Sequence, residues 1–254
     1  MSSANPSSAK AGQQILDKVT NHTQYHTEGL DRKDLKEDPL SQFHAWFQHA
    51  RDAGIKEPEA MTVATVSLRP INNNNSNSES GADGNANTAQ QFAAVPSSRI
   101  VLLKELDSRG FLFFTNYDSR KSAELLANPY ASLTFYWEPI HRSVRVVGRA
   151  EQLEPERSDA YYASRPRGSQ LGAWASPQSQ PIETRELLEE RVRAVEKEWE
   201  GKDVIQRPSN WGGWRIVPDE IEFWMGRESR LHDRFRYTRT APDADTWKVD
   251  RLGP

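Results

Sequence analysis

The chain has 254 residues, a formal net charge of −3 at pH 7, a sequence pI near 6.1 and no cysteine. A mildly acidic chain of this length can bury a large core, and it is a poor candidate for a general nucleic-acid binder, because such proteins are usually basic over the whole domain. The lack of cysteine excludes disulfides and thiolate chemistry, and no apolar run approaches the roughly 18 residues that a membrane-spanning helix requires.

Residues 1–20 are small and polar, and they lack the apolar core of a secretory signal. We expect them to form a disordered tail on a cytoplasmic protein. Asp38-Pro39 is a typical helix start, and apolar residues at helical spacing follow it. A strand is expected at 61–68. The Asn- and Ser-rich stretch at 72–91 has no apolar periodicity, so we interpret it as a loop inserted between two strands.

The rest of the chain alternates short strands with helices. Helices are expected at 120–127, 155–162 and 183–200. Strands are expected at 99–106, 110–116, 131–138, 143–153, 214–217, 220–225, 230–237 and 247–251. Many short strands with interposed helices favour a mainly β (α+β) fold, in which a β-barrel core and its helical additions form a single domain over residues 21–254.

A row of cations lies in the predicted strand at 230–237. They recur with the period of two that characterises an extended strand, so they share one face. They are Arg230, His232, Arg234 and Arg236. Aligned like charges are unfavourable unless an anion lies opposite, and guanidinium groups bind phosphate oxygens through paired hydrogen bonds. The segment is therefore either a phosphate site or a solvated basic edge strand that resists aggregation.

Two further segments combine cations with hydroxyl groups. Arg99 and Lys104 bracket an apolar strand, and their spacing directs them to opposite faces unless a bulge intervenes. At 115–121 a strand end runs into a helix start that carries Arg120-Lys121. Free N–H groups at such a helix start bind phosphate well. The alternative is a helix that Ser119 merely caps.

A fourth segment, residues 161–174, surrounds a Pro/Gly turn, where a loop could wrap an anion. Its polar side chains include Arg165, Arg167 and Ser169, and Gln178 and Ser179 follow. The alternative is an ordinary basic surface loop. Trp224 precedes the C-terminal row of cations and could cover a planar ligand. Several anion-binding segments together suggest two phosphorylated ligands, or one ligand with two phosphates.

Familiar catalytic motifs are missing from the sequence. It has no Gly-x-Gly-x-x-Gly after a strand, no Walker loop, no His-Glu-x-x-His and no Gly-x-Ser-x-Gly. We therefore expect no metal site, and we expect that demanding chemistry would depend on a bound cofactor.

Eight motifs follow one another along the chain. They are Arg99-Ile-Val-Leu-Leu-Lys104, Phe114-Thr-Asn-Tyr-Asp-Ser-Arg-Lys121, Ser164-Arg-Pro-Arg-Gly-Ser-Gln-Leu-Gly-Ala-Trp174, Gln178-Ser179, Trp211-Gly-Gly-Trp214, Ile221-Glu-Phe-Trp224, Arg230-Leu-His-Asp-Arg234 and Trp247-Lys-Val-Asp-Arg-Leu252. Together they resemble the pyridoxamine 5'-phosphate oxidase family. The similarity runs from about Tyr25 to Pro254 and is interrupted mainly by the Asn-rich stretch.

The resemblance implies an FMN-binding split β-barrel and a homodimer in which each FMN lies at the subunit interface. It also implies an FMN-dependent oxidoreductase that uses O2 to oxidise pyridoxamine 5'-phosphate or pyridoxine 5'-phosphate to pyridoxal 5'-phosphate. Hydrogen peroxide would be released, together with ammonia from the amine.

The resemblance assigns roles position by position. FMN contacts would come from Arg99, Ile100, Val101, Leu102, Leu103, Lys104, Phe114, Thr115, Arg120, Lys121, Gln178, Ser179, Trp224 and Arg234. The substrate phosphate would be held by Lys104, Tyr161, Arg165 and Ser169, while Arg230 and His232 would bracket the substrate ring as catalytic residues.

Two positions depart from the family pattern. A glutamine of the family that contacts the flavin is replaced by Ser143. Of the N-terminal segment that can cover the substrate in the family, only Tyr25 matches.

Two alternatives remain open at this stage. One is another FMN-binding split-barrel oxidoreductase, such as a flavin reductase-like protein, with a different substrate. Such a protein would not need a second phosphate clamp at Tyr161, Arg165 and Ser169. The other is a non-catalytic carrier of pyridoxal phosphate, which would absorb at about 390–420 nm and lack the flavin band at about 450 nm.

Overall fold

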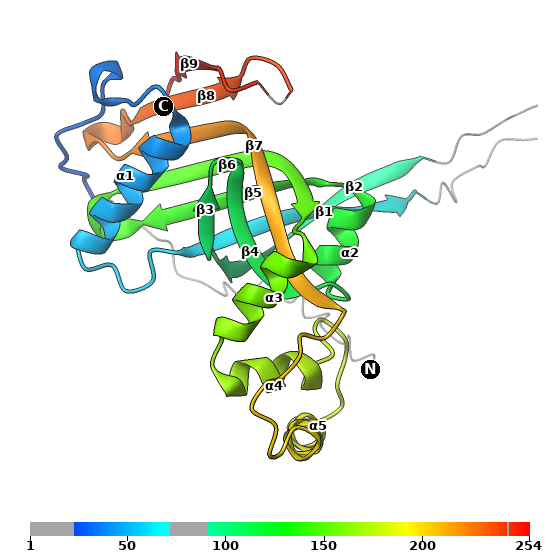
Figure 1. Cartoon of the computed structure of the whole chain (residues 1–254). Coiled ribbons are helices and arrows are strands. Elements are labelled where there is room, and N and C mark those ends of the chain that lie inside the picture. The colour runs from blue at the N-terminus through cyan, green and yellow to red at the C-terminus, as the bar shows by residue number, and fades with distance from the viewer. Residues whose placement is uncertain (1–22, 72–90, 243) are drawn as a thin grey trace, which may run out of the picture.

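The structure is a computed structural model that describes residues 23–71, 91–242 and 244–254 (Figure 1). The expected N-terminal tail at 1–20 lies outside the described residues, as does nearly all of the expected insertion at 72–91. Within the described ranges the strands form one nine-stranded antiparallel sheet in the order β2-β1-β5-β6-β7-β4-β3, with β8 paired to β7 and β9 paired to β8.

The elements agree with a mainly β fold that carries helices, as expected. The strands are β1 (Ala60–Pro70), β2 (Phe92–Leu102), β3 (Glu105–Asp107), β4 (Gly110–Asn116), β5 (Tyr130–Trp137), β6 (Arg142–Gln152), β7 (Trp211–Met225), β8 (Asp233–Arg239) and β9 (Trp247–Arg251). The helices are α1 (Pro39–Asp52), α2 (Arg120–Ala127), α3 (Pro155–Ser164), α4 (Arg167–Ala175) and α5 (Arg185–Glu198), with short 3-10 turns η1 (Arg32–Asp34), η2 (Glu138–Ile140) and η3 (Glu228–Arg230). In the ranges that the structure describes, no helix is both long and apolar enough to cross a membrane.

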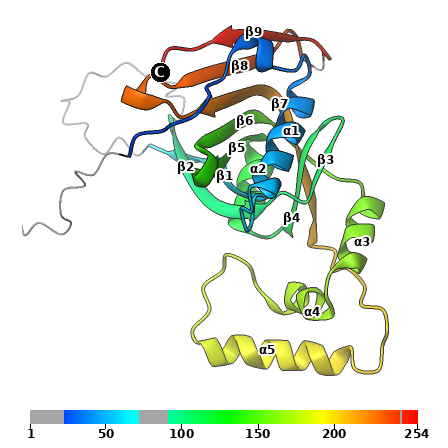
Figure 2. The ribbon, with the colours of Figure 1, turned by 90° about the vertical axis from the view of Figure 1, so that its left-hand side faces the viewer.

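The chain itself joins the two edges of the curled sheet. β2 lies at one edge and β3 at the other, and only Leu103 and Lys104 separate them in sequence. Leu103 N donates to Glu59 O on one side (2.9 Å), while Lys104 N donates to Leu112 O on the other (2.8 Å). The sheet therefore wraps around its core as an incompletely closed barrel (Figures 1 and 2). This confirms the split barrel.

Aromatic side chains fill the barrel, and α1 covers them. On β5 every second residue points inward, so Leu133, Phe135 and Trp137 are almost fully buried. Asp38 starts α1 by accepting hydrogen bonds from the first turn of the helix. Phe43 of α1 then packs with its ring centroid 4.8 Å from that of Phe135. Burial of these rings supplies much of the hydrophobic stabilisation of the barrel.

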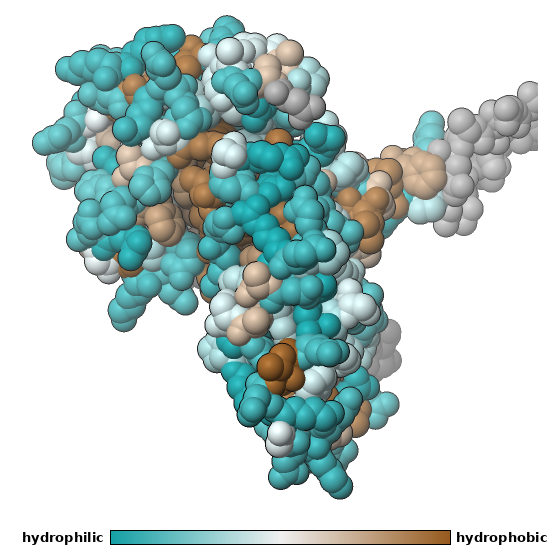
Figure 3. All heavy atoms as spheres, viewed as in Figure 1, coloured by the Kyte–Doolittle hydropathy of each residue, from teal (hydrophilic) through white to brown (hydrophobic). Residues whose placement is uncertain are grey.

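Helices α3, α4 and α5 build a separate lobe beside the barrel (Figure 2). A small apolar cluster holds it together, including Tyr162 of α3, Leu171 of α4 and Trp199 at the end of α5. No residue of α5 is fully buried, and the visible face of the lobe is largely hydrophilic (Figure 3). Trp211, the first residue of β7, belongs to the same cluster and joins the lobe to the sheet.

The two strands predicted at 214–217 and 220–225 are parts of the single strand β7. The expected breaks between 214–217 and 220–225 do not exist, because β7 runs through both with a register shift opposite Val147 and Gly148. Pro218 lies at this irregularity, where a missing N–H is tolerated.

The segment expected as an anion-wrapping loop after Ser164 is largely helical, so that expectation is wrong. Gln170 Nε2 donates to the carbonyls of Tyr162, Ala163 and Arg165, and Tyr162 Oη donates back to Gln170 O. These bonds fasten α4 against the end of α3. These tertiary bonds therefore prevail over the loop signals of Pro166 and Gly168.

The row of cations near the C-terminus is only partly on a strand. β8 begins at Asp233, so Arg230 and His232 precede it and do not share its face with Arg234 and Arg236. Ser229 and Arg230 have φ values of 55° and 62°, in the left-handed region that interrupts an extended chain. The observed strand therefore begins three residues after the start of the predicted range 230–237.

Candidate functional site

A buried lysine lies where β4 meets α2. Lys121 Nζ donates to Thr115 Oγ1 (2.9 Å), to Ser119 Oγ (3.2 Å) and to Gln178 Oε1 (2.7 Å). Ser119 makes no side-chain cap for α2, so its hydroxyl serves the lysine instead. Two segments, residues 115–121 and the loop that carries Gln178, thus converge on one ammonium group.

The electrostatics of Lys121 fit an anion. Its side chain is 8% exposed, and all three of these acceptors are neutral oxygens. Burial, with a smaller contribution from the charge of Arg99, lowers the pKa of Lys121 to about 8. A desolvated cation surrounded by neutral groups is costly, and an anionic ligand would reduce that cost.

Two predicted arginines lie in the same cluster and share one carboxylate. Arg120 Nε is 2.8 Å from Glu124 Oε1, one helical turn further along α2, and Arg99 NH2 is 3.3 Å from Glu124 Oε2. Burial raises the pKa of Glu124, but hydrogen bonds, first from Thr65 and then from Arg120 and Ser97, outweigh it and lower the pKa to about 2. With Lys121, three cations and one carboxylate leave a formal charge of +2, which matches a phosphate monoester dianion.

A second group of predicted residues forms an aromatic wall on the outside of the barrel. Phe114 of β4 stacks on Tyr161 of α3 at 3.9 Å and 17°, and Trp211 extends the stack. The guanidinium carbon of Arg165 lies 4.6 Å from the centroid of a Trp211 ring. Its NH1 is buried and has no hydrogen-bond partner. An orphaned guanidinium nitrogen is a donor that a phosphate oxygen would satisfy.

A third group lies at the far end of β7. Ser143, Trp224 and Arg234 line a hollow of about 420 Å³, together with Arg145. Ser143 and Arg145 are two residues apart on β6 and therefore share a face. Ser143 Oγ donates to Phe135 O (2.9 Å), so the hydroxyl that replaces the family's glutamine is bound to its own sheet.

His232 adjoins this hollow and is held in one orientation. Its Nδ1 accepts from Arg227 N (3.1 Å), and its ring centroid lies 4.7 Å from that of Trp224. Burial, and then the charges of Arg230 and Arg234, lower the pKa of His232 below 6.5. At pH 7 the imidazole is therefore neutral. With Nδ1 as the acceptor, the proton is on Nε2.

The N-terminal segment runs beside Trp224 and His232. The ring of Tyr25 lies 4.7 Å from that of His141, 6.0 Å from that of Trp224 and 5.8 Å from that of His232. Thr27 Oγ1 donates to Gly226 O (2.8 Å), which fastens the segment to the connection between β7 and β8. The one matching residue of the predicted cover is thus beside His232, one of the predicted catalytic residues.

The remaining predicted residues are dispersed. Ile100 is 66% exposed on β2, whereas Leu103 is buried in the barrel core and Val101 and Leu102 are half-buried. Lys104 lines a separate hollow of about 460 Å³ with Arg51 and Lys56, and does not line the wall that carries Arg165. Ser169 and Ser179 are exposed, on α4 and after it.

Strand β7 separates the first and third groups. Thr115 pairs with Gly212 at the start of β7, whereas Trp224 is close to its end. At roughly 3.3 Å per residue, about 40 Å of strand lies between them. Figure 1 shows β7 running from the helical lobe at one end to β8 at the other.

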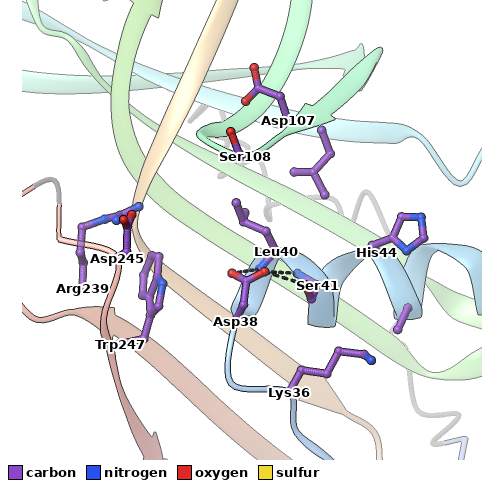
Figure 4. Close-up of a pocket in the computed structure, with 12 residues that line it drawn as sticks. Lys36, Asp38, Leu40, Ser41, His44, Asp107, Ser108, Arg239, Asp245 and Trp247 are labelled. Atoms are coloured by element: carbon purple, nitrogen blue, oxygen red, sulfur yellow. Dashed lines mark hydrogen bonds between the residues drawn. The ribbon is translucent and has the colours of Figure 1, made fainter.

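A larger hollow elsewhere gathers none of the predicted residues. About 720 Å³ lies between α1, the Asp107-Ser108 turn and Trp247 (Figure 4). Three of its charged groups already have partners, since Asp38 caps α1, Arg239 Nε donates to Pro218 O, and Asp107 accepts from Arg215. We assign no ligand to it.

Sequence analysis missed the carboxylates and one arginine of these groups. Glu124 holds Arg99 and Arg120, and Glu222 binds both Arg234 Nε (2.7 Å) and Arg145 NH2 (2.8 Å). One signal was available, because Glu124 follows Arg120 at the i,i+4 spacing of a helical ion pair. Glu222 and Arg145 carry no comparable local signal.

Comparison with known proteins gives consistent matches. Residues 47–198 match the family model described as pyridoxamine 5'-phosphate oxidase, and residues 211–254 match the pyridoxine 5'-phosphate oxidase C-terminal dimerisation region. A pyridoxine/pyridoxamine 5'-phosphate oxidase from Burkholderia lata is 47% identical over 230 residues, which cover 91% of this chain and 95% of the relative.

Two solved structures share the fold. PhzG from Burkholderia lata, in complex with tetrahydrophenazine-1-carboxylic acid, has a TM-score of 0.72 at 27% identity, covering 89% of this chain and 98% of its own. A pyridoxamine 5'-phosphate oxidase-related, FMN-binding protein from Nostoc punctiforme has a TM-score of 0.60 at 17% identity, covering 85% of this chain and 97% of its own.

Proposed function

The chain belongs to the pyridoxamine 5'-phosphate oxidase family, and on this basis we propose that it oxidises pyridoxamine 5'-phosphate and pyridoxine 5'-phosphate to pyridoxal 5'-phosphate. FMN is its cofactor. When bound, FMN supplies the hydride acceptor and the group that reacts with O2, so that hydrogen peroxide is released. The amine substrate also yields ammonia.

The observation that carries the proposal is the presence of two separate cationic places whose positive charge the protein does not fully neutralise. One is the cluster around Lys121, with a formal charge of +2. The other is the orphaned NH1 of Arg165 in the aromatic wall. FMN and the substrate each carry one phosphate, and two phosphates account for both places.

We assign the cofactor phosphate to the Lys121 cluster, formed by Arg99, Thr115, Arg120, Lys121 and Gln178. Arg165, with Tyr161 beside it, binds the substrate phosphate. Ser169 and Lys104 are the other predicted members of this clamp, although Lys104 lines a separate hollow of its own protomer. Trp224 and Arg234 flank the ring system of the cofactor. His232 adjoins this hollow, and Arg230 is near enough for its charge to lower the pKa of His232. We assign both to the substrate ring, with the neutral His232 donating from Nε2.

A second copy of the chain completes the site in this proposal. The Lys121 cluster and the Trp224 hollow are separated by most of β7, so one protomer cannot easily present both to one flavin. The residues of the Trp224 hollow from β7 onward fall within the matched dimerisation region at 211–254. We infer a homodimer in which the Lys121 cluster of one protomer faces the Trp224 and Arg234 of the other.

The likeness to PhzG suggests a second candidate, oxidation of a tricyclic carboxylic acid. A carboxylate could also accept from Arg165. The sequence identities favour the vitamin B6 reaction. Both proteins come from Burkholderia lata, and this chain is 47% identical to the pyridoxine/pyridoxamine 5'-phosphate oxidase but only 27% identical to PhzG.

An aerobic peroxide assay on FMN-loaded protein tests the proposal. Pyridoxamine 5'-phosphate and pyridoxine 5'-phosphate should each release peroxide as pyridoxal 5'-phosphate forms, whereas unphosphorylated pyridoxine should react far more slowly. No peroxide from either phosphorylated vitamer, with turnover of tetrahydrophenazine-1-carboxylic acid, would establish the second candidate instead. A flavin-free protein that binds pyridoxal phosphate would point to a carrier.

A further inference from the structure

Glu124 is a buried carboxylate to which the assignments above give no role. It lies on α2 and is 5% exposed. Its Oε2 accepts from Thr65 Oγ1 (2.5 Å) and from Ser97 Oγ (2.8 Å). Thr65 and Ser97 face each other across β1 and β2, so one oxygen links the helix to two strands.

The same two hydroxyl groups accept from Arg99. Arg99 NH1 donates to Thr65 Oγ1 (2.5 Å) and NH2 donates to Ser97 Oγ (2.6 Å), while NH2 also reaches Glu124 Oε2 at 3.3 Å. The network is therefore closed around Arg99, and each hydroxyl donates to the carboxylate and accepts from the guanidinium. The other oxygen, Oε1, accepts from Arg120 Nε (2.8 Å). One carboxylate fixes both arginines.

Stability alone is a weak reason for such an arrangement. Replacing buried ion pairs by packed apolar residues is often neutral or stabilising, because desolvation offsets much of the attraction. The arrangement does, however, hold two long side chains that would otherwise sample many rotamers. Arg120 is the neighbour of Lys121 on α2, and Arg99 is close enough for its charge to lower the pKa of Lys121, whose cluster is the proposed place of the cofactor phosphate.

We propose that Glu124 is a positioning residue, which holds Arg99 and Arg120 in the orientation that binds the phosphate of FMN. The inference rests on the proposed function and adds a residue that touches neither cofactor nor substrate. It has an unusual consequence, because the negatively charged Glu124 is expected to strengthen the binding of the negatively charged FMN phosphate.

Electrostatic attraction alone predicts the opposite effect of Glu124 on phosphate binding. Replacing Glu124 by glutamine would raise the formal charge of the cluster from +2 to +3, and a more positive cluster should bind phosphate more tightly. If positioning dominates, the same replacement weakens binding. Glutamine keeps one acceptor oxygen, but its NH2 group must face donors on the other side, so it cannot hold both arginines.

The test compares FMN with riboflavin, which lacks the phosphate. Cofactor-stripped full-length protein is titrated with each flavin, and binding is followed by flavin fluorescence. In Glu124→Gln we expect FMN affinity to fall roughly tenfold to hundredfold, from the ordering cost of two arginine side chains, while riboflavin affinity stays unchanged. A merely structural role would weaken both flavins alike.

The chain offers a matched control. Arg185 Nε is 3.0 Å from Glu189 Oε1 in α5, an i,i+4 pair with the same chemistry as Arg120 and Glu124 but on the exposed lobe. Glu189→Gln removes the same charge and should leave both affinities at their wild-type values.

Each outcome decides the matter. Tighter FMN binding by Glu124→Gln, or an unchanged ratio of FMN to riboflavin affinity, overturns the inference while leaving the proposed function intact. Equal affinity of the wild-type protein for the two flavins overturns the phosphate assignment and the inference with it. If Glu124→Gln does not fold, Ser97→Ala keeps every charge and removes one link; it should lower FMN affinity selectively, and an unchanged ratio refutes the inference.

Discussion

Lys121→Met should stabilise the cofactor-free protein while weakening its hold on FMN. Lys121 is 8% exposed, and its pKa falls from 10.5 to about 8 because of burial and the nearby Arg99. At about 1.4 kcal/mol per pKa unit, this corresponds to an upper limit of about 3 kcal/mol of destabilisation by the buried charge. Methionine has a similar length and no charge, so it fills the same space.

The lost hydrogen bonds reduce this gain. Thr115, Ser119 and Gln178 lose a donor in the variant, although Thr115 Oγ1 still donates to Gln178 Oε1 (2.8 Å). At about 0.5–1.5 kcal/mol per bond, these losses offset part of the upper limit. We expect a net stabilisation of about 1 kcal/mol near pH 7.

The pH dependence has a definite sign. Below pH 8 the lysine is protonated in the folded and unfolded states alike, so its destabilising effect is fully present. Between about 8 and 10.5 the unfolded chain keeps a proton that the folded chain has lost, so wild-type stability rises with pH relative to the variant. The advantage of Lys121→Met should therefore shrink across this window.

FMN binding should change in the opposite direction. A charge-assisted bond to phosphate contributes about 1.5–3 kcal/mol, so the variant should bind FMN roughly tenfold to hundredfold more weakly. Wild-type affinity should decline above pH 8, because binding then requires the lysine to take up a proton. The variant should show no such decline.

Urea unfolding of the cofactor-free proteins and fluorescence titration with FMN, both near pH 7 and pH 9, check these expectations. Lys197→Met, at an exposed position of α5, is the control for loss of a lysine charge. A variant that is less stable than wild type and binds FMN equally well would refute the electrostatic account of Lys121.

Three other predictions follow from the site. Arg230→Ala should lower kcat/KM far more than FMN affinity, since Arg230 is assigned to the substrate ring; a mutant with wild-type turnover would contradict that role. Arg165→Gln should raise KM for pyridoxine 5'-phosphate about tenfold or more while leaving FMN affinity intact, because its orphaned NH1 is assigned to the substrate phosphate; steady-state kinetics with an unchanged KM would remove Arg165 from the clamp. Replacing residues 72–90 by a short turn should preserve activity and melting temperature, because Pro70 pairs with Phe92 and Ile71 N donates to Gln91 O (2.8 Å); loss of activity in a folded, FMN-loaded variant would show that the segment has a function.

The parts of the fold that sequence predicts best are those bounded by strong local signals. β4 and α2 have the predicted bounds, because Gly110 opens the strand and Asn128-Pro129 stops the helix. α4 was missed because Pro166 and Gly168 are equally strong loop signals. The bonds from Gln170 that fasten α4 to α3 are tertiary features, which no local pattern shows.

The same contrast between local signals and tertiary contacts applies to the candidate site. Its cations stand out in sequence as clusters, and the structure brings Arg99 and Arg120, which the resemblance groups together, to one carboxylate. Some of the groups that hold them are distant in sequence, since Thr65 lies 34 residues from Arg99 and Gln178 lies 57 residues from Lys121. Sequence therefore indicates which charges matter, but it does not show which buried partners orient them.

The distribution of carboxylates between the Lys121 cluster and the Trp224 hollow indicates how FMN would be oriented in the proposed site. At the hollow beside Trp224, Arg145 and Arg234 both bind Glu222, and Arg145 also binds Glu220, so each of these two cations has a carboxylate partner. The anion that aligned cations require is supplied there by the protein itself. At the Lys121 cluster a formal charge of +2 remains. A ligand with a dianionic phosphate at one end and an aromatic ring system at the other is most stable with its phosphate at the cluster and its rings against Trp224, because each end then meets the environment that complements it. In the proposed homodimer the same reasoning would orient the two protomers, with the charged end of FMN on one chain and the aromatic end on the other.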